Sequence, residues 1–339
     1  MVSAKRASAD GWATGDAGRD RRRGCLLGTA VGDALGAPGE FLSADAIHSR
    51  FGPAGISRLY PWDGFPAGSF TDDTQMSLAT ADGLVRAEHA VQAGGPCDPV
   101  ASVRERYIAW HDSQADPHER RHPGHTCMTA LRAAKAGHVG PAANWSKGCG
   151  GVMRTAPVGL APPRRAPFSL AADLAALTHG HPSGFLSAGF VADLVRRLVD
   201  GAALADAARA SVAELRRHDA AEETLAAVLQ AESLASQSGV DGFAGVRRLG
   251  QGWVGEEALA VSLFCALRHP DDWRAAVLLA VNHDGDTDST GAITGAILGA
   301  ALGVGAIPVE WGGAVEDGSR IAELADELWR LDAAAESGS

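Results

Sequence analysis

Several features that identify other classes of protein are scarce in this 339-residue chain. Its five cysteines form no C-x-x-C pair, which argues against a disulfide framework or a zinc site and favours a reducing compartment. The formal net charge is −11, so general attraction to nucleic acid or to an anionic membrane is not expected. Only two tyrosines are present, and alternating, strand-like segments are nearly absent. We therefore expect a cytoplasmic protein that is largely helical.

The N-terminal segment and one apolar stretch bear on targeting. The first 23 residues are polar and rich in arginine, and they lack the apolar core of a secretory signal. We interpret residues 1–17 as a disordered tail. Residues 289–309 are long enough for a membrane span, but they are mostly Gly and Ala and directly follow an aspartate-rich segment. We expect them to form a buried helix, with no membrane segment.

Apolar residues recur at helical spacing in eleven segments of the chain. These segments are 21–36, 75–89, 99–113, 126–136, 184–198, 204–217, 220–237, 255–268, 273–282, 289–303 and 319–335. The Pro- and Gly-rich breaks between them are too short to be domain linkers. We predict one all-α domain over residues 18–335, and we expect a monomer.

Two of the predicted helices carry glycine at every fourth position. The segment GCLLGTAVGDALG has glycines at 24, 28, 32 and 36, and GAITGAILGAALG has them at 291, 295, 299 and 303. A glycine inside a helix costs about 1 kcal/mol relative to alanine, so eight of them need a reason. Spaced by four, they line one face of each helix and allow another helix to approach closely. If these helices pack together or on common neighbours, the acidic residues at their ends can meet.

Two acidic clusters lie where predicted helices begin, in GSFTDDTQM and in HDGDTDSTG. Each cluster can be interpreted as a helix cap, with Asp288 or Ser289 as the cap of the second. Capping needs few acceptors, however, and carboxylates beside hydroxyls are also the ligands that Mg²⁺ prefers. An EF-hand is excluded, because the second cluster lacks the Gly and the Glu that such a loop requires at its sixth and twelfth positions.

Three further motifs have both a structural and a functional interpretation. In GDALGAPGEF, Asp33 suits a buried capping or bridging role, and Glu40 alone suggests an ordinary surface acid. SKGCGGVMRTAPVGL, residues 146–160, is a Gly-rich loop before a predicted apolar helix; its backbone amides suit a phosphate, although a flexible turn fits as well. In LTHGHPSG, the spacing of His179 and His181 disfavours a zinc pair and fits capping or substrate contact.

The chain resembles the ADP-ribosylglycohydrolase family, including its dinitrogenase-reductase-activating glycohydrolase type. The resemblance spans residues 21–312 and rests on the order and spacing of GCLLGTAVGDALGAPGEF, GSFTDDTQM, SKGCGGVMRTAPVGL, LTHGHPSG and GDTDSTGAITGAILGA. It implies an all-α, orthogonally packed domain with a binuclear Mg²⁺ or Mn²⁺ centre. It further implies hydrolysis of the bond between C1″ of ADP-ribose and a modified target, and a counterpart ADP-ribosyltransferase that attaches the group.

The same resemblance implies roles for individual residues. The first cluster would bind one metal ion, and the second cluster would complete the pair of ions. Asp288 would bridge the two ions. The implied metal ligands are Glu40, Thr71, Asp72, Asp73, Asp286, Asp288 and Ser289. The implied catalytic residues are Glu40, Asp73 and Asp288. The implied substrate contacts are His125, Gly148, Cys149, Gly150, Gly151, Val152, Met153 and His179.

The chain departs from the family pattern at three positions. His122 stands where some relatives carry an aspartate, and asparagine is common in relatives where this chain has His125 and Cys149. These departures leave the target linkage open among arginine, serine, a nucleic-acid base and a small metabolite. Two other functions remain as alternatives. A di-metal phosphoester hydrolase would release phosphate from nucleotides, and a non-catalytic ADP-ribose-binding relative would have lost part of the metal motifs.

Overall fold

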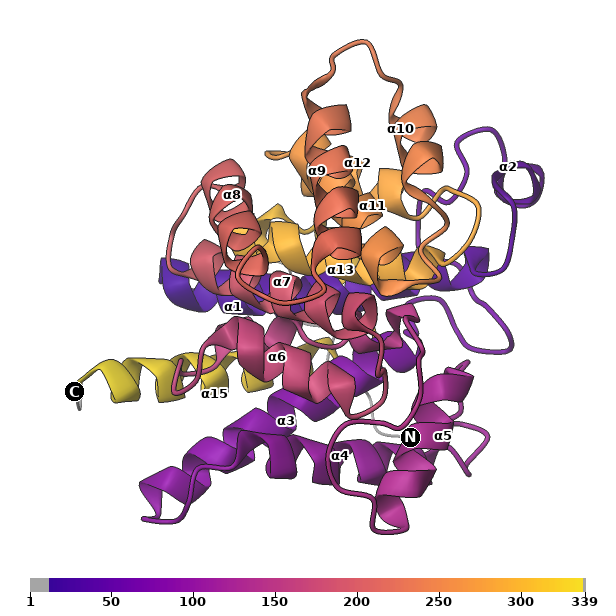
Figure 1. The fold of residues 1–339 in the computed structure, drawn as a ribbon. Coiled ribbons are helices and arrows are strands. Elements are labelled where there is room, and N and C mark those ends of the chain that lie inside the picture. Colours follow the sequence, from indigo (N-terminus) through magenta and orange to yellow (C-terminus); the bar gives the residue numbers. More distant parts are fainter. Residues whose placement is uncertain (1–11, 338–339) are drawn as a thin grey trace.

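Fifteen α-helices make up most of residues 12–337, the part of the chain that this computed structural model describes (Figure 1). They are α1 (Ala17–Gly36), α2 (Ala44–Phe51), α3 (Asp72–Gln92), α4 (Pro99–Ser113), α5 (His125–Lys135), α6 (Pro167–Ala176), α7 (Pro182–Val199), α8 (Leu204–Leu215), α9 (Glu222–Ser236), α10 (Gly242–Leu249), α11 (Gly255–Arg268), α12 (Trp273–Ala280), α13 (Thr287–Leu302), α14 (Val309–Gly312) and α15 (Gly318–Ser337). Within residues 12–337 there is no β-strand, only isolated bridges such as Gly148 with Val254. The predicted all-α fold is confirmed.

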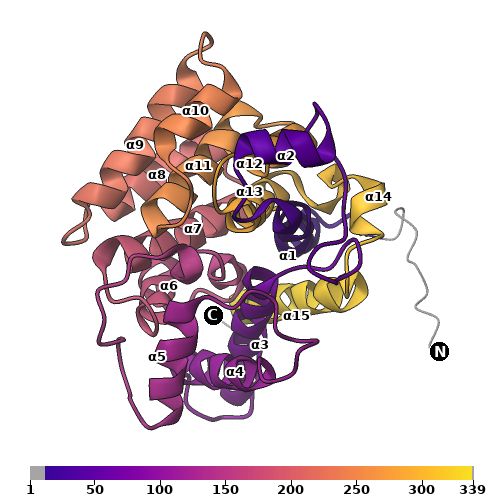
Figure 2. The same ribbon diagram turned by 90° about the vertical axis from the view of Figure 1, so that its right-hand side faces the viewer.

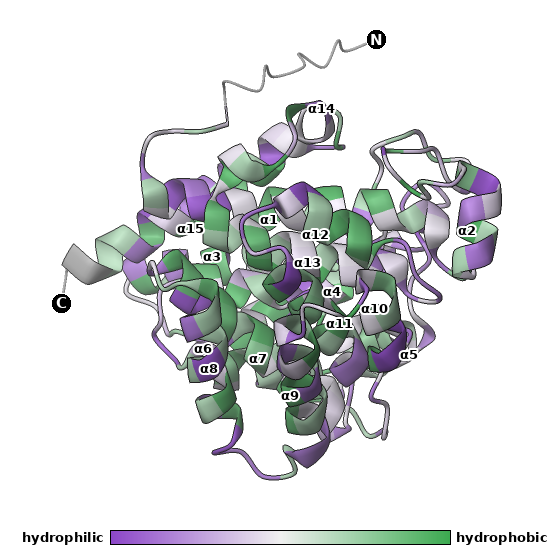
Figure 3. Cartoon of the chain, turned by 90° about the horizontal axis from the view of Figure 1, so that it is seen from above, coloured by the Kyte–Doolittle hydropathy of each residue, from purple (hydrophilic) through white to green (hydrophobic). Residues whose placement is uncertain are grey.

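The helices form a central group with further helices on both sides. In Figure 1, α1, α7 and α13 run across the middle, α8 to α12 lie above them, and α3 to α6 with α15 lie below. The view in Figure 2 shows α1 and α13 nearly end-on and side by side. Apolar residues concentrate on these inner helices, whereas polar residues are frequent on outer ones such as α2 and α15 (Figure 3). The core therefore surrounds the two glycine-rich helices.

The glycine stripes of α1 and α13 face each other in antiparallel register. A Cβ atom added at Gly28 would lie 2.2 Å from the carbonyl oxygen of Gly295, and one at Gly32 would lie 2.1 Å from that of Gly291. A Cβ atom added at Gly36, at the end of α1, would likewise lie 2.5 Å from the Cα of Asp288. The two backbones are thus in contact along their length. The spacing predicted a close approach by another helix, and the structure shows that each of these two helices is the other's partner. This packing places the C-terminal end of α1 beside the first turn of α13.

Four helices of the structure lie outside the eleven predicted segments. The helices α2 and α10 have only eight residues each, α14 has four, and α6 has ten and starts at a proline. Segments this short are marginal alone and form because their apolar faces dock on the core. One predicted helix does not form: the prediction of an apolar helix after the Gly-rich loop is wrong. Residues 149–160 instead contain two 3₁₀ turns, Cys149–Gly151 and Ala156–Leu160.

Most of the predicted tail, residues 1–11, lies outside the described part of the chain. Trp12 packs against the core, and its carbonyl accepts a hydrogen bond from Arg23 at 2.6 Å. Asp16 caps α1 through a hydrogen bond from the amide of Arg19. Among the described residues, no helix has the length and apolar content needed to cross a bilayer.

Candidate active site

The first turn of α3 obtains its capping from residues other than its two aspartates. Thr71 is the N-cap, and its hydroxyl accepts from the amide of Asp73 at 3.3 Å. The carboxylate of Asp33 accepts from the amides of Thr71 and Thr74, both at 2.9 Å. The amide of Asp72 donates to the carbonyl of Arg121 at 3.0 Å. All four amides that open the helix are therefore satisfied without the carboxylates of Asp72 and Asp73.

The carboxylates of Asp72 and Asp73 therefore do not cap α3. Both are buried, and Oδ1 of Asp73 has no hydrogen-bond partner. Oδ2 of Asp72 accepts only a long hydrogen bond, of 3.4 Å, from the amide of Gly124. The interpretation of TDDT as a cap is thus wrong for the aspartates, and the capping role weighed for Asp33 is confirmed.

In the second cluster, too, some aspartates cap helices and another has an unpartnered oxygen. Asp286 is the N-cap of α13, accepting from the amide of Ser289 at 3.3 Å, so the predicted cap at Asp288 or Ser289 is wrong by two or three residues. Asp284 turns away and accepts from the amide of Ala44 at 2.8 Å, at the start of α2. Asp288 lies in the first turn of α13, buried, and its Oδ1 has no partner.

The helix packing joins the two clusters into one buried group of acids. Burial raises the pKa of Asp33 to about 7, with a further contribution from the charge of Asp288. Burial and then Asp288 likewise raise the pKa values of Asp72, Asp73 and Asp286 well above the usual range. The charge of Asp288 therefore acts on every other member, which fits the central position that the family resemblance gives it.

Glu40 lies at the edge of this group, just after the end of α1. Burial raises its pKa to about 11, with contributions from the charges of Asp288, Asp72 and Asp33. Its Oε2 is 2.8 Å from Nδ1 of His122, whose Nε2 is 3.1 Å from Asp63. Glu40 is therefore a largely buried acid, and the interpretation as an ordinary surface acid, which its sequence context by itself suggested, is wrong. The sequence showed His122 as a departure from the family pattern but gave no sign of this contact.

The donor set of the acidic group fits hard divalent cations. It offers carboxylate and hydroxyl oxygens, and two buried oxygens, on Asp73 and Asp288, have no partner. Buried carboxylates this close together repel one another unless protons or cations neutralise them. Within residues 12–337, however, no three His, Cys, Asp or Glu side chains already have the arrangement of a metal site. Binding a cation therefore requires these side chains to turn toward it.

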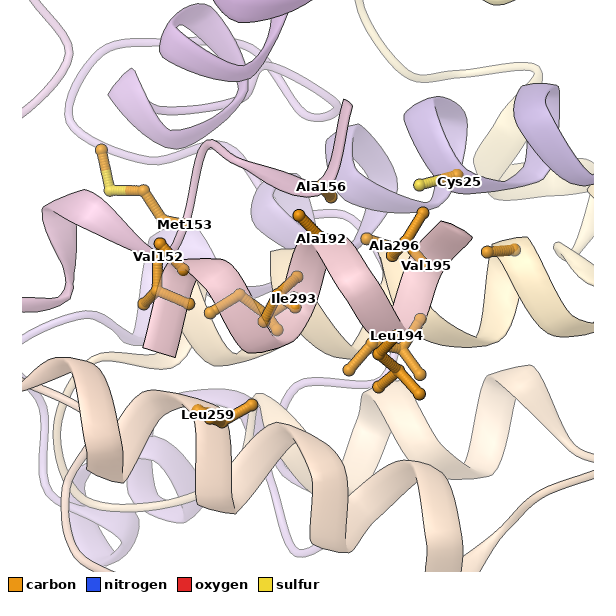
Figure 4. Packing of buried hydrophobic residues seen from close by; sticks show 14 of the residues in the cluster. Cys25, Val152, Met153, Ala156, Ala192, Leu194, Val195, Leu259, Ile293 and Ala296 are labelled. Carbon is orange, nitrogen blue, oxygen red and sulfur yellow. The ribbon is translucent and has the colours of Figure 1, made fainter. Parts of the chain in front are cut away.

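The Gly-rich loop runs directly beside the second cluster. The thiol of Cys149 lies 2.8 Å from Oδ2 of Asp286, and the Ser289 hydroxyl lies 3.7 Å from the same sulfur. The amide of Cys149 donates to the carbonyl of Trp253 at 3.1 Å. At the end of the loop, Val152 and Met153 are buried in the same core as Ile293 of α13 (Figure 4). The loop is thus held at both ends, and residues 148–150 are half-buried.

The buried ring of His179 packs against this loop. Its side chain is 2% exposed, and a Cβ at Gly150 would lie 3.1 Å from its ring. Burial, followed by the charge of Arg154, lowers the pKa of His179 to about 3, so the ring is neutral. The other histidine predicted to contact substrate, His125, is exposed at the first residue of α5. His181 is the N-cap of α7, as one of its interpretations predicted.

Arg154 is a buried residue of the site that the sequence did not reveal. Its guanidinium is fully buried, with the centre 4.4 Å from the ring centroid of Tyr107, and it donates to the hydroxyl of Thr178 at 2.6 Å. That hydroxyl is 2.8 Å from Nδ1 of His179. A single arginine within the apolar run GVMRTAPVGL was the available signal.

Comparison with known proteins places the chain among related hydrolases. Residues 14–338 match the family model described as ADP-ribosylglycohydrolase. The chain is 29% identical to the ADP-ribosyl-[dinitrogen reductase] glycohydrolase of Rhodospirillum rubrum, over 88% of this chain and 91% of that protein. It is 26% identical to the ADP-ribosylarginine hydrolase Tri1 of Serratia proteamaculans (strain 568), over 92% and 80%. A solved structure titled ADP-ribosylglycohydrolase-related protein complex superposes with a TM-score of 0.70 at 27% identity, covering 93% of this chain and 99% of that one.

Proposed function

Because this chain belongs to the ADP-ribosylglycohydrolase family, we propose that it is a metal-dependent ADP-ribosyl hydrolase. The observation that carries this proposal is the pair of unpartnered, buried carboxylate oxygens on Asp73 and Asp288. Keeping clustered carboxylates buried without partners is unfavourable, and no capping function accounts for them. A site that binds cations does account for them.

Two Mg²⁺ or Mn²⁺ ions would be held by the first turns of α3 and α13 with Glu40. The proposed ligands are Glu40, Thr71, Asp72, Asp73, Asp286, Asp288 and Ser289. When bound, such ions supply Lewis acidity, orient sugar hydroxyls and make water more acidic. Residues 148–153 would contact the diphosphate and the distal ribose, with the neutral ring of His179 packed against the loop. The amides of Cys149, Val152 and Met153 already donate to carbonyl groups, so Gly150 and Gly151 are the residues proposed to donate to the phosphates.

The proposed reaction breaks the bond between C1″ and the target atom and forms a new bond from C1″ to the oxygen of water. The target atom leaves with a proton. Glu40 is the acid placed to supply it, in a state in which its carboxyl is protonated and not bound to a metal, because that carboxyl lies at the edge of the buried group and is only 10% exposed. The attacking water loses a proton, and the ionised carboxylates of Asp73 and Asp288 are the groups that would take it.

The test is release of intact ADP-ribose from ADP-ribosylated arginine, serine and nucleic-acid substrates, with Mg²⁺, with Mn²⁺ and with EDTA. We expect release that depends on the metal and that is lost in Asp288→Asn. Asp284→Asn is the matched control from the same segment, since Asp284 contacts α2 and the asparagine retains an acceptor. Release of phosphate from nucleotides would favour a phosphoester hydrolase. Binding of ADP-ribose without any turnover would favour the non-catalytic alternative.

A further inference from the structure

Arg154 is a buried cation that has no carboxylate partner. Within residues 12–337, its hydrogen bonds go to two sulfur atoms, one carbonyl and one hydroxyl, and none goes to an acid. The contact with the Thr178 hydroxyl is the shortest at 2.6 Å, and the other three are 3.4 Å. Burying a guanidinium without an acid is costly, so this arrangement calls for a functional explanation.

The hydroxyl of Thr178 links Arg154 to the ring of His179. The guanidinium can only donate, so the oxygen of Thr178 accepts from it. The same oxygen is 2.8 Å from Nδ1 of His179 and 3.3 Å from the carbonyl oxygen of Ala175, and its single proton can go to only one of them. The ring is neutral, because burial and then the charge of Arg154 lower the pKa of His179 to about 3. It therefore carries one proton, on Nδ1 or on Nε2.

The charge of Arg154 favours one of these two tautomers. A hydroxyl that accepts from a guanidinium is polarised and becomes a stronger donor. A cation attracts the lone pair of a nearby ring nitrogen and repels an N–H that points toward it. The distance of 2.8 Å also makes Nδ1 a better acceptor for the hydroxyl than the carbonyl at 3.3 Å. Nδ1 therefore accepts from Thr178, and the proton of the ring lies on Nε2.

Nε2 of His179 lies against the Gly-rich loop. A Cβ atom added at Gly148 would lie 3.3 Å from this nitrogen, and one added at Gly150 would lie 3.4 Å from it. No residue of the described part of the chain forms a hydrogen bond with Nε2. Gly150 is also one of the two residues whose amides are proposed to donate to the phosphates. An N–H on Nε2 adds a side-chain donor beside these backbone donors.

We propose that Arg154 and Thr178 are positioning residues, which fix His179 in the tautomer with its proton on Nε2 so that this N–H donates to a phosphate oxygen of ADP-ribose. This inference rests on the proposed ADP-ribosyl hydrolase function, which places the diphosphate at the Gly-rich loop. The opposite tautomer would turn a lone pair toward the phosphate, and two acceptors repel each other. Arg154 and Thr178 thus act on the ligand through His179, without touching it.

The tautomer is measured first, in the free protein. Nitrogen NMR of labelled imidazole rings shows which ring nitrogen carries the proton, and His179→Ala identifies the signal of His179. We expect the proton on Nε2 in the wild type and in Thr178→Ser, which keeps the hydroxyl. In Thr178→Val, Nδ1 loses its hydrogen-bond donor, and we expect a mixture of both tautomers. A wild-type ring protonated on Nδ1 would overturn this inference and leave the hydrolase function intact.

Binding of ADP-ribose in Mg²⁺, measured by calorimetry, tests the role of the tautomer. Thr178→Val should lower the affinity by about tenfold, and Thr178→Ser should bind as the wild type does. When His179 is already alanine, Thr178→Val should cause no further loss, because the hydroxyl acts through that ring. Thr80→Val is the matched control, since Thr80 is equally buried but its hydroxyl contacts Tyr107 at 2.7 Å. It should leave the tautomer and the affinity unchanged.

The double variant separates positioning from a general effect on the loop. If Thr178→Val lowers the affinity as much with alanine at position 179 as with histidine, Thr178 acts independently of the ring and the inference is wrong. Thr178→Ala removes the same hydroxyl and takes the place of Thr178→Val if that variant does not fold. If wild-type protein binds no ADP-ribose, the proposed function fails, and the donor role of His179 falls with it whatever the tautomer.

Discussion

Oδ2 of Asp33 accepts two hydrogen bonds from Thr74, one from its amide at 2.9 Å and one from its hydroxyl at 2.5 Å. The two residues are 41 positions apart in the chain. This contact joins the end of α1 to the start of α3. Together with the hydrogen bond from the amide of Thr71 to Oδ1 of Asp33, it satisfies two amides at the start of α3.

Removing the Asp33 carboxylate should therefore destabilise the protein more than removing an ordinary cap. We expect Asp33→Ala to lower the free energy of unfolding by about 3 kcal/mol, because it leaves three buried donors without an acceptor. Asp98→Ala is the control: Asp98 caps α4 at an exposed position, and its loss should cost about 1 kcal/mol. Urea denaturation in saturating Mg²⁺ measures both. Equal losses would show that Asp33 is not the main cap of α3.

The contact between α1 and α13 predicts strong intolerance to one methyl group. Gly28→Ala should raise helix propensity, yet we expect a loss of about 3 kcal/mol or more, because the new Cβ would lie 2.2 Å from a backbone oxygen of α13 that cannot move aside. Gly18→Ala on the same helix is the control, since its Cβ would make only ordinary contacts, the nearest at 3.4 Å. Thermal unfolding of both variants is the measurement. A stable Gly28→Ala protein would contradict the backbone contact.

Metal binding should become more stabilising as the pH rises. The pKa of Asp33 is raised from its usual value to about 7, and those of Asp72, Asp73 and Asp286 are also raised. Between about pH 4 and pH 7 the metal-free folded state thus holds more protons than the unfolded chain, so its stability falls as the pH increases through this window. A cation must displace these protons, so its binding is favoured by higher pH.

We therefore expect the increase in Tm on adding Mg²⁺ or Mn²⁺ to be small at pH 5 and larger at pH 8. Thermal unfolding with and without metal at both pH values is the measurement. In Asp288→Asn the increase should be lost at both. A metal-induced shift that is the same at pH 5 and pH 8 would mean that the ions bind away from the buried carboxylates.

The Gly-rich loop should be sensitive to side chains that displace it. A Cβ at Gly150 would lie 2.9 Å from Sγ of Cys127 and 3.1 Å from the ring of His179, so Gly150→Ala must shift the loop. We expect ADP-ribose affinity to fall by about tenfold or more, with little change in Tm, because loop geometry determines where the amides point. Gly124→Ala is the control, since no atom lies within 4 Å of its added Cβ. Isothermal titration calorimetry distinguishes the two, and unchanged affinity in Gly150→Ala would exclude the loop from the binding site.

Much of this architecture was predictable because it depends on local patterns. Apolar spacing located the long helices, and glycine at every fourth position of α1 and α13 indicated the close approach of another helix to each, because only glycine lets two helix backbones touch. The short helices α2, α6, α10 and α14 were missed, since their stability comes from docking on the core. The motifs also indicated the family, and they predicted a group of acids without showing which of them would cap a helix and which would stay unpartnered.

The sequence by itself thus determined the fold class and the close approach of another helix to each of α1 and α13. Only the tertiary structure decided how each acid of the site is used. Asp33 caps α3 together with Thr71, Asp286 caps α13, and Asp73 and Asp288 each keep an oxygen without a partner. The physical reason is that an acceptor's partner is set by distances between segments far apart in the chain, and those distances exist only after the helices have packed.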